Sequence, residues 1–328
     1  MSWIFFKDRF LPNPTGGTVP FTLPTVILEI QADFVAGASL DPRAGLSRRM
    51  KRMGVAELQS PALVPLPSGA NIGNAAELRR AVRAITDVVG NGTGRFGLLL
   101  PDGTVRVSIL SFETLPEHRR EAEALVRWRM RESLPFAPEE ARLSYQVSWR
   151  EPGLVEVLAV AARSAVLAEY EQALEQMSGG PILILPATIA LLPLLPERYE
   201  RGQLLVHVCS GLVTTAVVVG SRLRFWRTRD LGRTSPEEMS KGVAAEAART
   251  LASSRDHLNL EMGRVWLCAR PPAAPEMAAE LARAVSQEVE LLVPGANFAA
   301  TLPVPEQALY ERYGATIAGL ISNAGFES

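Results

Sequence analysis

The sequence contains few of the residues that build metal sites and disulfide frameworks. Its 328 residues include two cysteines and three histidines, and these lie far apart along the chain. A structural zinc site needs about four such ligands at short spacings, and a disulfide framework needs several cysteine pairs. The composition therefore argues against both classes of protein and favours a reducing cytosol as the compartment.

An excess of charge of one sign is also absent. The 34 Lys and Arg residues balance 35 Asp and Glu residues, and aromatic residues make up 6% of the chain. We therefore expect no nucleic-acid partner, because neither a basic face nor a set of base-stacking aromatics is indicated. No apolar run approaches the roughly 20 residues of a transmembrane helix, and no signal peptide is evident.

The residues that are present suffice for large hydrophobic cores. Hydrophobic residues make up 47% of the chain and charged residues 21%, as in ordinary globular proteins. The length suits one large domain or two to three subdomains. We therefore expect a folded α/β protein.

The first part of the chain predicts strands followed by a helix. Apolar and polar residues alternate from Thr25 to Leu40, which indicates two strands. Asn74 is a candidate N-cap for a helix over 75–89. A buried strand is expected at 96–101, and Asp102-Gly103 predicts a hairpin turn into a partner strand at 105–109.

The middle of the chain predicts a small helix–strand–strand–helix unit, and the remainder a second α/β half. In the middle unit, helices over 116–134 and 164–177 flank strands at 141–150 and 154–162. The second half is expected to contain the following strands and helices, in chain order: strands 204–208, 214–219 and 222–227, helix 236–254, strand 265–269, helix 275–285, strand 289–293 and helix 310–321.

Two other segments leave alternatives open. The aromatic cluster from Trp3 to Phe10 is either a tether to a membrane face or partner, or an extension packed on its own domain. The basic run from Arg43 to Met53 is either a phosphate-binding segment or a solvated hairpin turn.

The order of these elements resembles the PilM family, the cytoplasmic actin-like proteins of type IV pilus assembly. The segments that carry the resemblance are Leu115-Pro116, Arg131 to Phe136, Glu139-Glu140, Ser144 to Val147 and Tyr313 to Leu320. The resemblance implies an actin-like (ribonuclease H-like) two-domain α/β fold with a small α/β subdomain inserted in the first half. The domain bounds it suggests are an extension 1–20, a first subdomain 21–113 with 181–200, an insertion 114–180, a second half 201–308, and a C-terminal helix 309–328 that packs on the first subdomain.

The nucleotide-binding motifs of actin-like proteins are altered at every corresponding position. Such proteins hold phosphates with two hairpins, each bearing an Asp and a Gly that lets the backbone approach the phosphates. The first hairpin has Glu29 and Gln31 at these positions, and the second has His207 and Cys209. Asp230 to Arg233 keeps one glycine, Gly232, and Ala269 with Arg270 replaces a Gly-Gly turn. We therefore expect no cofactor, and the alternative is an ATPase with Mg²⁺ whose site is rebuilt from other residues.

Other candidate chemistry is weaker. His207 and Cys209 share one face of a strand, which suggests either a metal or nucleophile pair or ordinary core residues, but a third ligand is missing nearby. Glu29 alone is a possible general base. Cys268 is expected to be a small buried hydrophobic residue, and the Gly90–Gly94 run lacks the Lys-Ser/Thr ending of a phosphate loop.

The resemblance also implies a partner. PilM-like proteins bind the short cytoplasmic tail of a single-span inner-membrane protein, PilN-like, and so lie in the cytoplasm, peripheral to the inner membrane. The expected groove is walled by Trp128, Met130, Leu134, Pro135 and Phe136; the alternative is that these residues are core of a small subdomain. The predicted function is a scaffold of a pilus or related secretion complex without ATP hydrolysis. A cell-division or sugar-kinase relative of the same fold is a further, less favoured class.

Overall fold

The computed structural model describes residues 23–41, 49–59, 62–90, 96–175, 177, 180–196, 199, 201–232, 234–270 and 275–323. The chain divides into two compact units, one formed by 1–192 with 294–328 and the other by 193–293. The aromatic segment 3–10 and the first part of the basic run, 43–48, lie outside the described residues, as do Gly92 and Gly94. In the described part of the chain, no helix is long and apolar enough to cross a membrane.

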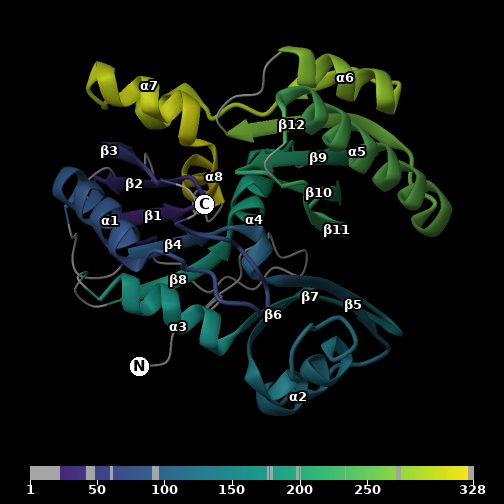
Figure 1. Cartoon of the computed structure of the whole chain (residues 1–328). Helices are drawn as coiled ribbons and strands as arrows, with labels where there is room; N and C mark the ends of the chain where they lie inside the picture. Colours follow the sequence, from purple (N-terminus) through teal and green to yellow (C-terminus); the bar gives the residue numbers. More distant parts are fainter. Residues whose placement is uncertain are drawn as a thin grey trace. The chain divides into compact units, whose positions relative to one another are not determined.

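The first unit is organised around a five-stranded sheet (Figure 1). Its strand order is β3-β2-β1-β4-β8. The strands are β1 (Val26–Ile30), β2 (Phe34–Leu40), β3 (Met50–Glu57), β4 (Phe96–Leu100) and β8 (Pro181–Pro186). Strands β1 to β3 form an antiparallel meander, whereas β4 and β8 continue the sheet in parallel. The predicted hairpin turn extends too far, because the chain is already in β3 at Met50, where Met50 and Met53 are buried.

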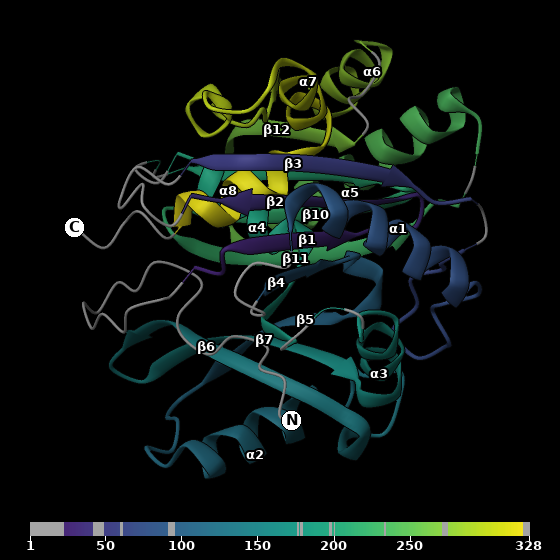
Figure 2. The same cartoon turned by 90° about the vertical axis from the view of Figure 1, so that its left-hand side faces the viewer.

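Helices cover both faces of this sheet, as Figure 2 shows with α1 in front of the strands and α8 behind them. Helix α1 (Ala75–Val89) packs on β2 and β3, where Gly37 and Gly54 give Ile85 room to approach. A Cβ at Gly97, on the opposite face, would contact Leu320 of α8 (Ala315–Asn323). The predicted cap is confirmed, since the Asn74 side chain accepts from the backbone N–H of Glu77 at the start of α1.

A three-stranded sheet, in the order β5-β7-β6, forms the middle of the chain. It consists of β5 (Arg106–Phe112), β6 (Ala141–Glu151) and β7 (Leu154–Arg163). The predicted hairpin at Asp102-Gly103 was wrong. These residues form a short 3₁₀ helix that directs the chain out of β4 and into β5, which pairs with β7 instead. Burial explains the difference, because the Asp102 carboxylate lies inside and accepts from the backbone N–H of Thr188.

Two helices accompany the three-stranded sheet. Helix α2 (Arg119–Met130) buries Ala122, Val126 and Met130 at helical spacing. Val126 and Met130 share a core with Val157 of β7. Helix α3 (Ser164–Ala173) follows β7 directly and buries Tyr170. The predicted helix–strand–strand–helix order is therefore confirmed, with β5 as a third strand beside β7.

The end of the chain returns to the first unit as two helices. Helix α7 (Val304–Tyr313) packs on β3, and α8 packs on α4 (Ala187–Leu191). The predicted single helix over 310–321 was wrong, because the chain breaks at Gly314, where a Cβ would lie 2.3 Å from the ring of Tyr310. The Gly-Leu pair near the end has a packing role: a Cβ on Gly319 would lie 2.0 Å from the carbonyl oxygen of Ala190.

The second unit repeats the topology of the first sheet. Its strand order is β11-β10-β9-β12-β13, with an antiparallel meander followed by two parallel strands. The elements are β9 (Gly202–Cys209), β10 (Leu212–Val219), β11 (Arg222–Asp230), α5 (Pro236–Leu258), β12 (Met262–Arg270), α6 (Pro275–Val285) and β13 (Val289–Leu291). Two five-stranded sheets with one strand order are the pattern of an actin-like fold, and the predicted fold class is confirmed. The predicted domain bounds stay a prediction.

Candidate functional site

Glu29, the predicted counterpart of a nucleotide-site acid, is enclosed in the first unit. It is the penultimate residue of β1 and is fully buried. Its Oε1 accepts from Gln31 Nε2 at 2.7 Å, and its Oε2 accepts from Thr316 Oγ1 of α8 at 2.5 Å. Both carboxylate oxygens are therefore engaged by side chains of the same unit.

Gln31 occupies the position where a phosphate-binding hairpin has glycine. Its side chain is buried, and its backbone N–H donates to the carbonyl of Phe34, which closes the turn between β1 and β2. Where the motif has a glycine without a side chain, this chain has a buried Gln31 side chain that donates to Glu29. The first hairpin is thus a closed polar cluster of Glu29, Gln31 and Thr316.

The predicted site residues of the second unit lie together. The strand register pairs Arg270 with Cys209 and places Ala269 beside Val208, so these residues share the carboxyl ends of β9 and β12. The β9–β10 turn consists of Ser210 and Gly211, both with positive φ. Gly211 accepts from the backbone N–H of Leu231, which brings Gly232 to the same turn.

His207 contacts Arg270 inside this group. The Arg270 Nη2 lies 3.1 Å from His207 Nε2, and both side chains are buried. Because the guanidinium only donates hydrogen bonds, His207 Nε2 is the acceptor and the imidazole is a neutral partner at that atom. This contact makes the ring nitrogen unsuitable as a metal ligand, because the lone pair already serves Arg270.

The two cysteines, Cys209 and Cys268, are both buried, and no disulfide joins them. The sequence expectation of a buried Cys268 is confirmed. No group of three or more His, Cys, Asp and Glu side chains suited to a metal ion occurs among the described residues.

The residues of the predicted partner groove divide into surface and core. Trp128 on α2 is 52% exposed, and the guanidinium carbon of Arg131 lies 4.5 Å from its ring centroid. Met130, two residues later, is fully buried against the three-stranded sheet. Trp128 therefore belongs to the surface of α2 and Met130 to the core beneath it.

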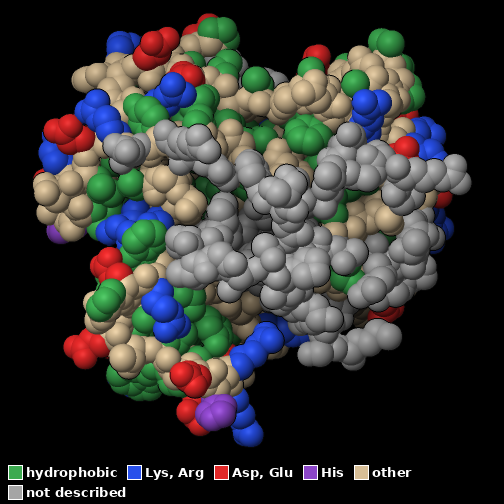
Figure 3. Space-filling view, turned by 180° about the vertical axis from the view of Figure 1, so that it is seen from behind, with side chains coloured by type: hydrophobic (Ala, Val, Ile, Leu, Met, Phe, Trp, Pro, Cys, Tyr) green, Lys and Arg blue, Asp and Glu red, His purple; other side chains and the backbone are tan. Residues whose placement is uncertain are grey.

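The turn after α2 continues this surface. Pro135 is exposed, while Leu134 and Phe136 are half-buried and pack against the core that contains Met130. Figure 3 shows hydrophobic side chains at the lower left of the molecule, among charged side chains of both signs.

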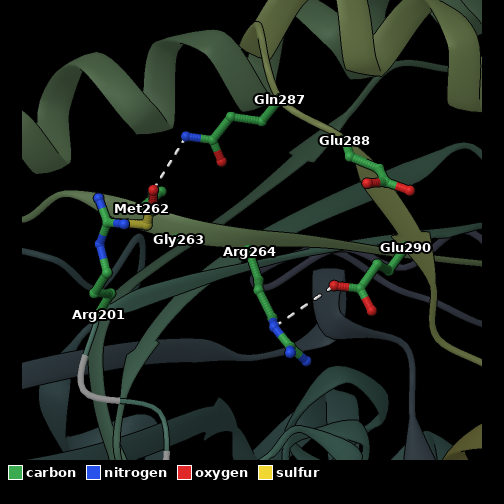
Figure 4. A pocket seen from close by; sticks show the side chains of 7 residues that line it. All are labelled: Arg201, Met262, Gly263, Arg264, Gln287, Glu288 and Glu290. Carbon is green, nitrogen blue, oxygen red and sulfur yellow. Dashed lines mark hydrogen bonds and ion pairs between the residues drawn. The ribbon is translucent and has the colours of Figure 1, made fainter.

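A polar pocket of about 380 Å³ lies in the second unit, where the parallel strands begin (Figure 4). Arg264 pairs with Glu290 at 3.7 Å, and Gln287 donates to the carbonyl of Met262 at 3.1 Å. The other lining residues are Arg201, Gly263 and Glu288. Ligands of parallel α/β sheets bind outside the carboxyl ends of the strands, whereas this pocket lies at their amino ends. The lining includes two arginines and two glutamates and therefore favours no ligand of one charge sign.

Two contributors to these clusters were missed from the sequence. Thr316 lies 287 residues from Glu29, and no local pattern connects them. Ser210-Gly211 is a recognisable turn signal that could have located the glycine at the tip of the second hairpin, two residues after the position of Cys209.

Comparisons with known proteins agree with the topology. No protein-family model and no curated protein matches the sequence. A solved structure of the PilM–PilN type IV pilus biogenesis complex matches with a TM-score of 0.75 at 17% sequence identity, over 93% of this chain and 99% of that chain.

Two further structures are similar at lower TM-scores. The cytoplasmic domain of EpsL, an inner-membrane component of the type II secretion system of Vibrio cholerae, has a TM-score of 0.49 at 11% identity, over 88% of this chain and 95% of its own. A Bacteroides thetaiotaomicron protein with an actin-like ATPase fold has a TM-score of 0.48 at 8% identity, over 87% and 94%. The match to the PilM–PilN structure confirms the resemblance in the fold: this chain has a PilM-like, actin-like fold.

Proposed function

We propose that this protein is a cytoplasmic scaffold of a type IV pilus or related secretion complex at the inner membrane. The observation that supports this most is the similarity to the PilM–PilN complex along nearly the whole of both chains. In this proposal the protein binds the short cytoplasmic tail of a PilN-like single-span membrane protein and reaches the membrane only through that partner.

We further propose that the protein works without ATP hydrolysis. The closed cluster of Glu29, Gln31 and Thr316 supports this, because the Glu29 carboxylate is fully buried and both of its oxygens are held by side chains of the protein, which leaves it poorly placed to orient a metal-bound water. The neutral His207 at the second hairpin supports it too, since Mg²⁺ prefers oxygen ligands. The alternative is an actin-like ATPase of the same machinery with a rebuilt site.

Thermal unfolding with nucleotide tests this part of the proposal. A ligand at about 100 times its Kd stabilises a protein by about 2.7 kcal/mol, which corresponds to a Tm increase of several degrees for a chain of this size. We expect no such increase with 1 mM ATP or ADP and Mg²⁺ (about the concentration that this arithmetic requires for a 10 µM site). Saturable nucleotide binding by calorimetry, together with ATP turnover, would establish the alternative.

The surface formed by Trp128, Pro135 and Phe136 is the proposed binding site for the tail. An exposed tryptophan on a helix that is followed by a turn with half-buried apolar side chains has the character of an interface anchor. An extended tail can also pair with an edge strand of the three-stranded sheet, where main-chain hydrogen bonds supply affinity and side-chain pockets supply specificity.

The tail experiment uses the purified full chain. The probe is a synthetic peptide of the cytoplasmic tail of the single-span membrane protein encoded by the neighbouring gene. We expect Trp128→Ala and Phe136→Ala each to weaken binding by about tenfold or more, as hot-spot residues do. The matched control is Leu291→Ala, an exposed apolar residue of the second unit. Tail binding that survives in both variants would exclude this surface.

A further inference from the structure

Strand β11 lies at an edge of the sheet in the second unit (Figure 1). It is nine residues long, Arg222–Asp230, and its partner within the sheet is β10. In the described part of the chain, no other strand pairs with it. A long edge strand presents a row of backbone N–H and C=O groups that another chain can pair with.

The strand register shows which backbone groups point outward. The backbone N–H of Leu231 donates to the carbonyl of Gly211, so the backbone of Leu231 faces β10. Arg229 and Arg227 lie two and four residues earlier in the same register, and their backbone groups therefore face β10 as well. The intervening residues, Trp226 and Thr228, therefore direct their N–H and C=O groups away from β10. These two residues form the template for an added strand.

The side chains along this edge are strongly basic. Arg222, Arg224, Arg227 and Arg229 all lie on β11, against one acidic residue, Asp230. Arg249 of α5 belongs to the same group, because Glu246, also of α5, forms ion pairs with Arg249 and with Arg227 and Arg229 of β11.

Glu246 is a single buried carboxylate shared by three arginines. Its oxygens lie 2.9 Å from Arg229 Nη1, 2.5 Å from Arg249 Nη2 and 3.5 Å from Arg227 Nε. The carboxylate is 1% exposed, whereas the three arginine side chains are each about half-exposed, between 47% and 51%. Three positive charges against one negative charge leave an excess of two positive charges at the edge of the sheet. The ion pairs with Glu246 of α5 fix the positions of the three arginines.

The first unit shows how the corresponding edge strand of its own sheet is covered. Strand β3 holds the corresponding place in the first sheet and is covered by α7. There Glu306 accepts from the backbone N–H of Met53 at 2.7 Å and from Arg52 Nε at 2.8 Å. An acidic side chain thus satisfies both an arginine and an edge-strand N–H, and β11 carries the same two kinds of donor.

We propose that β11 is a docking edge for an extended acidic segment of a partner protein, which adds to the sheet as a further strand. Its backbone would pair with Trp226 and Thr228, and its carboxylates would lie beside Arg227, Arg229 and Arg249. A second copy of this chain does not fit edge to edge, because two arginine-rich strands repel each other. The proposal concerns a different surface from the one assigned to the tail.

The probe for this edge is a fluorescein-labelled ten-residue peptide of alternating Glu and Val, which places its carboxylates on one face of a strand. We expect saturable binding to the full chain in fluorescence anisotropy, weakening as NaCl is raised because charged groups near the surface are screened. The comparison peptide alternates Lys and Val and is expected not to bind. Hydrogen exchange of the complex should show added protection at Trp226 and Thr228.

A pair of variants at one position separates backbone pairing from charge. Thr228→Pro removes the outward N–H without changing any charge, and proline is tolerated on the open side of an edge strand. Thr228→Val keeps the N–H but loses the hydroxyl contact with Thr214. We expect Thr228→Val to bind like the wild type and Thr228→Pro to bind at least tenfold more weakly, with both variants folded by circular dichroism.

A second set of variants tests the charges. Arg227→Gln with Arg229→Gln is expected to weaken peptide binding at least tenfold. The control replaces two exposed arginines on α1 and α6, Arg80→Gln with Arg283→Gln, and is expected to leave peptide binding unchanged. Equal binding by the Glu–Val and Lys–Val peptides would overturn the proposal. Binding unaffected by Thr228→Pro, or protection elsewhere than in β11, would do the same.

Discussion

The carboxylate of Glu306 accepts a hydrogen bond from the backbone N–H of Met53, 253 residues earlier in the sequence. Its other oxygen accepts from Arg52. Glu306 thus closes the edge strand β3 with a helix from the end of the chain, and Thr301 adds a bond to the carbonyl of Met50 at 2.7 Å.

This relationship predicts a specific loss of stability. We expect Glu306→Ala to lower the free energy of unfolding by about 1–3 kcal/mol, because the buried N–H of Met53 loses its acceptor. Glu306→Gln keeps an acceptor oxygen and should cost clearly less. Urea denaturation measures both. Equal losses in the two variants would show that the hydrogen bond to Met53 is not the cause.

Gly319 predicts a steric effect. A methyl group there meets the backbone carbonyl of Ala190, so Gly319→Ala forces α8 and α4 apart and should cost about 1–3 kcal/mol. The control is Gly295→Ala, where the added Cβ has its nearest neighbour at 3.9 Å. Thermal unfolding should show a lower Tm for Gly319→Ala alone, and a wild-type Tm would mean that the helices pack less closely.

The hydrogen bond from Thr316 to Glu29 is expected to contribute to the free energy of unfolding. Thr316→Val removes the hydroxyl that donates to Glu29 while keeping the side-chain shape, and we expect a loss of about 1–3 kcal/mol. Thr86→Val removes an exposed hydroxyl on α1 and should change stability by less than about 0.5 kcal/mol. Indistinguishable urea midpoints for the two variants would contradict the role of Thr316.

Glu246 predicts a dependence of stability on pH. Burial raises the pKa of its carboxyl, but the hydrogen bond from Arg249 and the charges of the surrounding arginines outweigh burial and hold the pKa below its ordinary value. The ionised carboxylate therefore stabilises the fold above about pH 4.3, the pKa of a glutamate in the unfolded chain. This contribution is lost as the pH falls through the lower pKa of Glu246 in the folded protein.

The measurement is the free energy of unfolding from pH 7 to pH 3, for the wild type and Glu246→Gln. We expect the wild type to lose more stability than the variant as the pH falls below about 4.3, because the variant has no carboxyl to protonate at this position. Parallel profiles would mean that Glu246 contributes nothing to acid unfolding.

The local signals of this sequence predicted local structure well. Asn74 begins α1 as a cap because its side chain needs only the N–H of Glu77, three residues away. The alternation from Thr25 to Leu40 predicted β1 and β2, because successive side chains of a strand point to opposite faces and the two strands pair with each other in one hairpin. The order of the segments carried the resemblance that the fold confirms.

The errors arose where a distant segment decided the outcome. Asp102-Gly103 has the composition of a hairpin turn, but Thr188 binds Asp102 and β7 takes β5 as its partner. At Gly314, the ring of Tyr310 and the return of α8 to α4 break a helix that looked continuous. Composition alone does not contain these contacts.

The same division holds for the altered nucleotide motifs. The sequence by itself determined that Gln31 and Cys209 replace the usual glycines and that His207 replaces an acid, because residue identity is a local property. Only the tertiary structure decided what these residues do: Thr316 engages Glu29 across 287 residues, and Arg270 meets His207 on a neighbouring strand. A buried polar group must find its hydrogen-bond partner wherever the fold places one, and that partner is chosen by packing rather than by position in the chain.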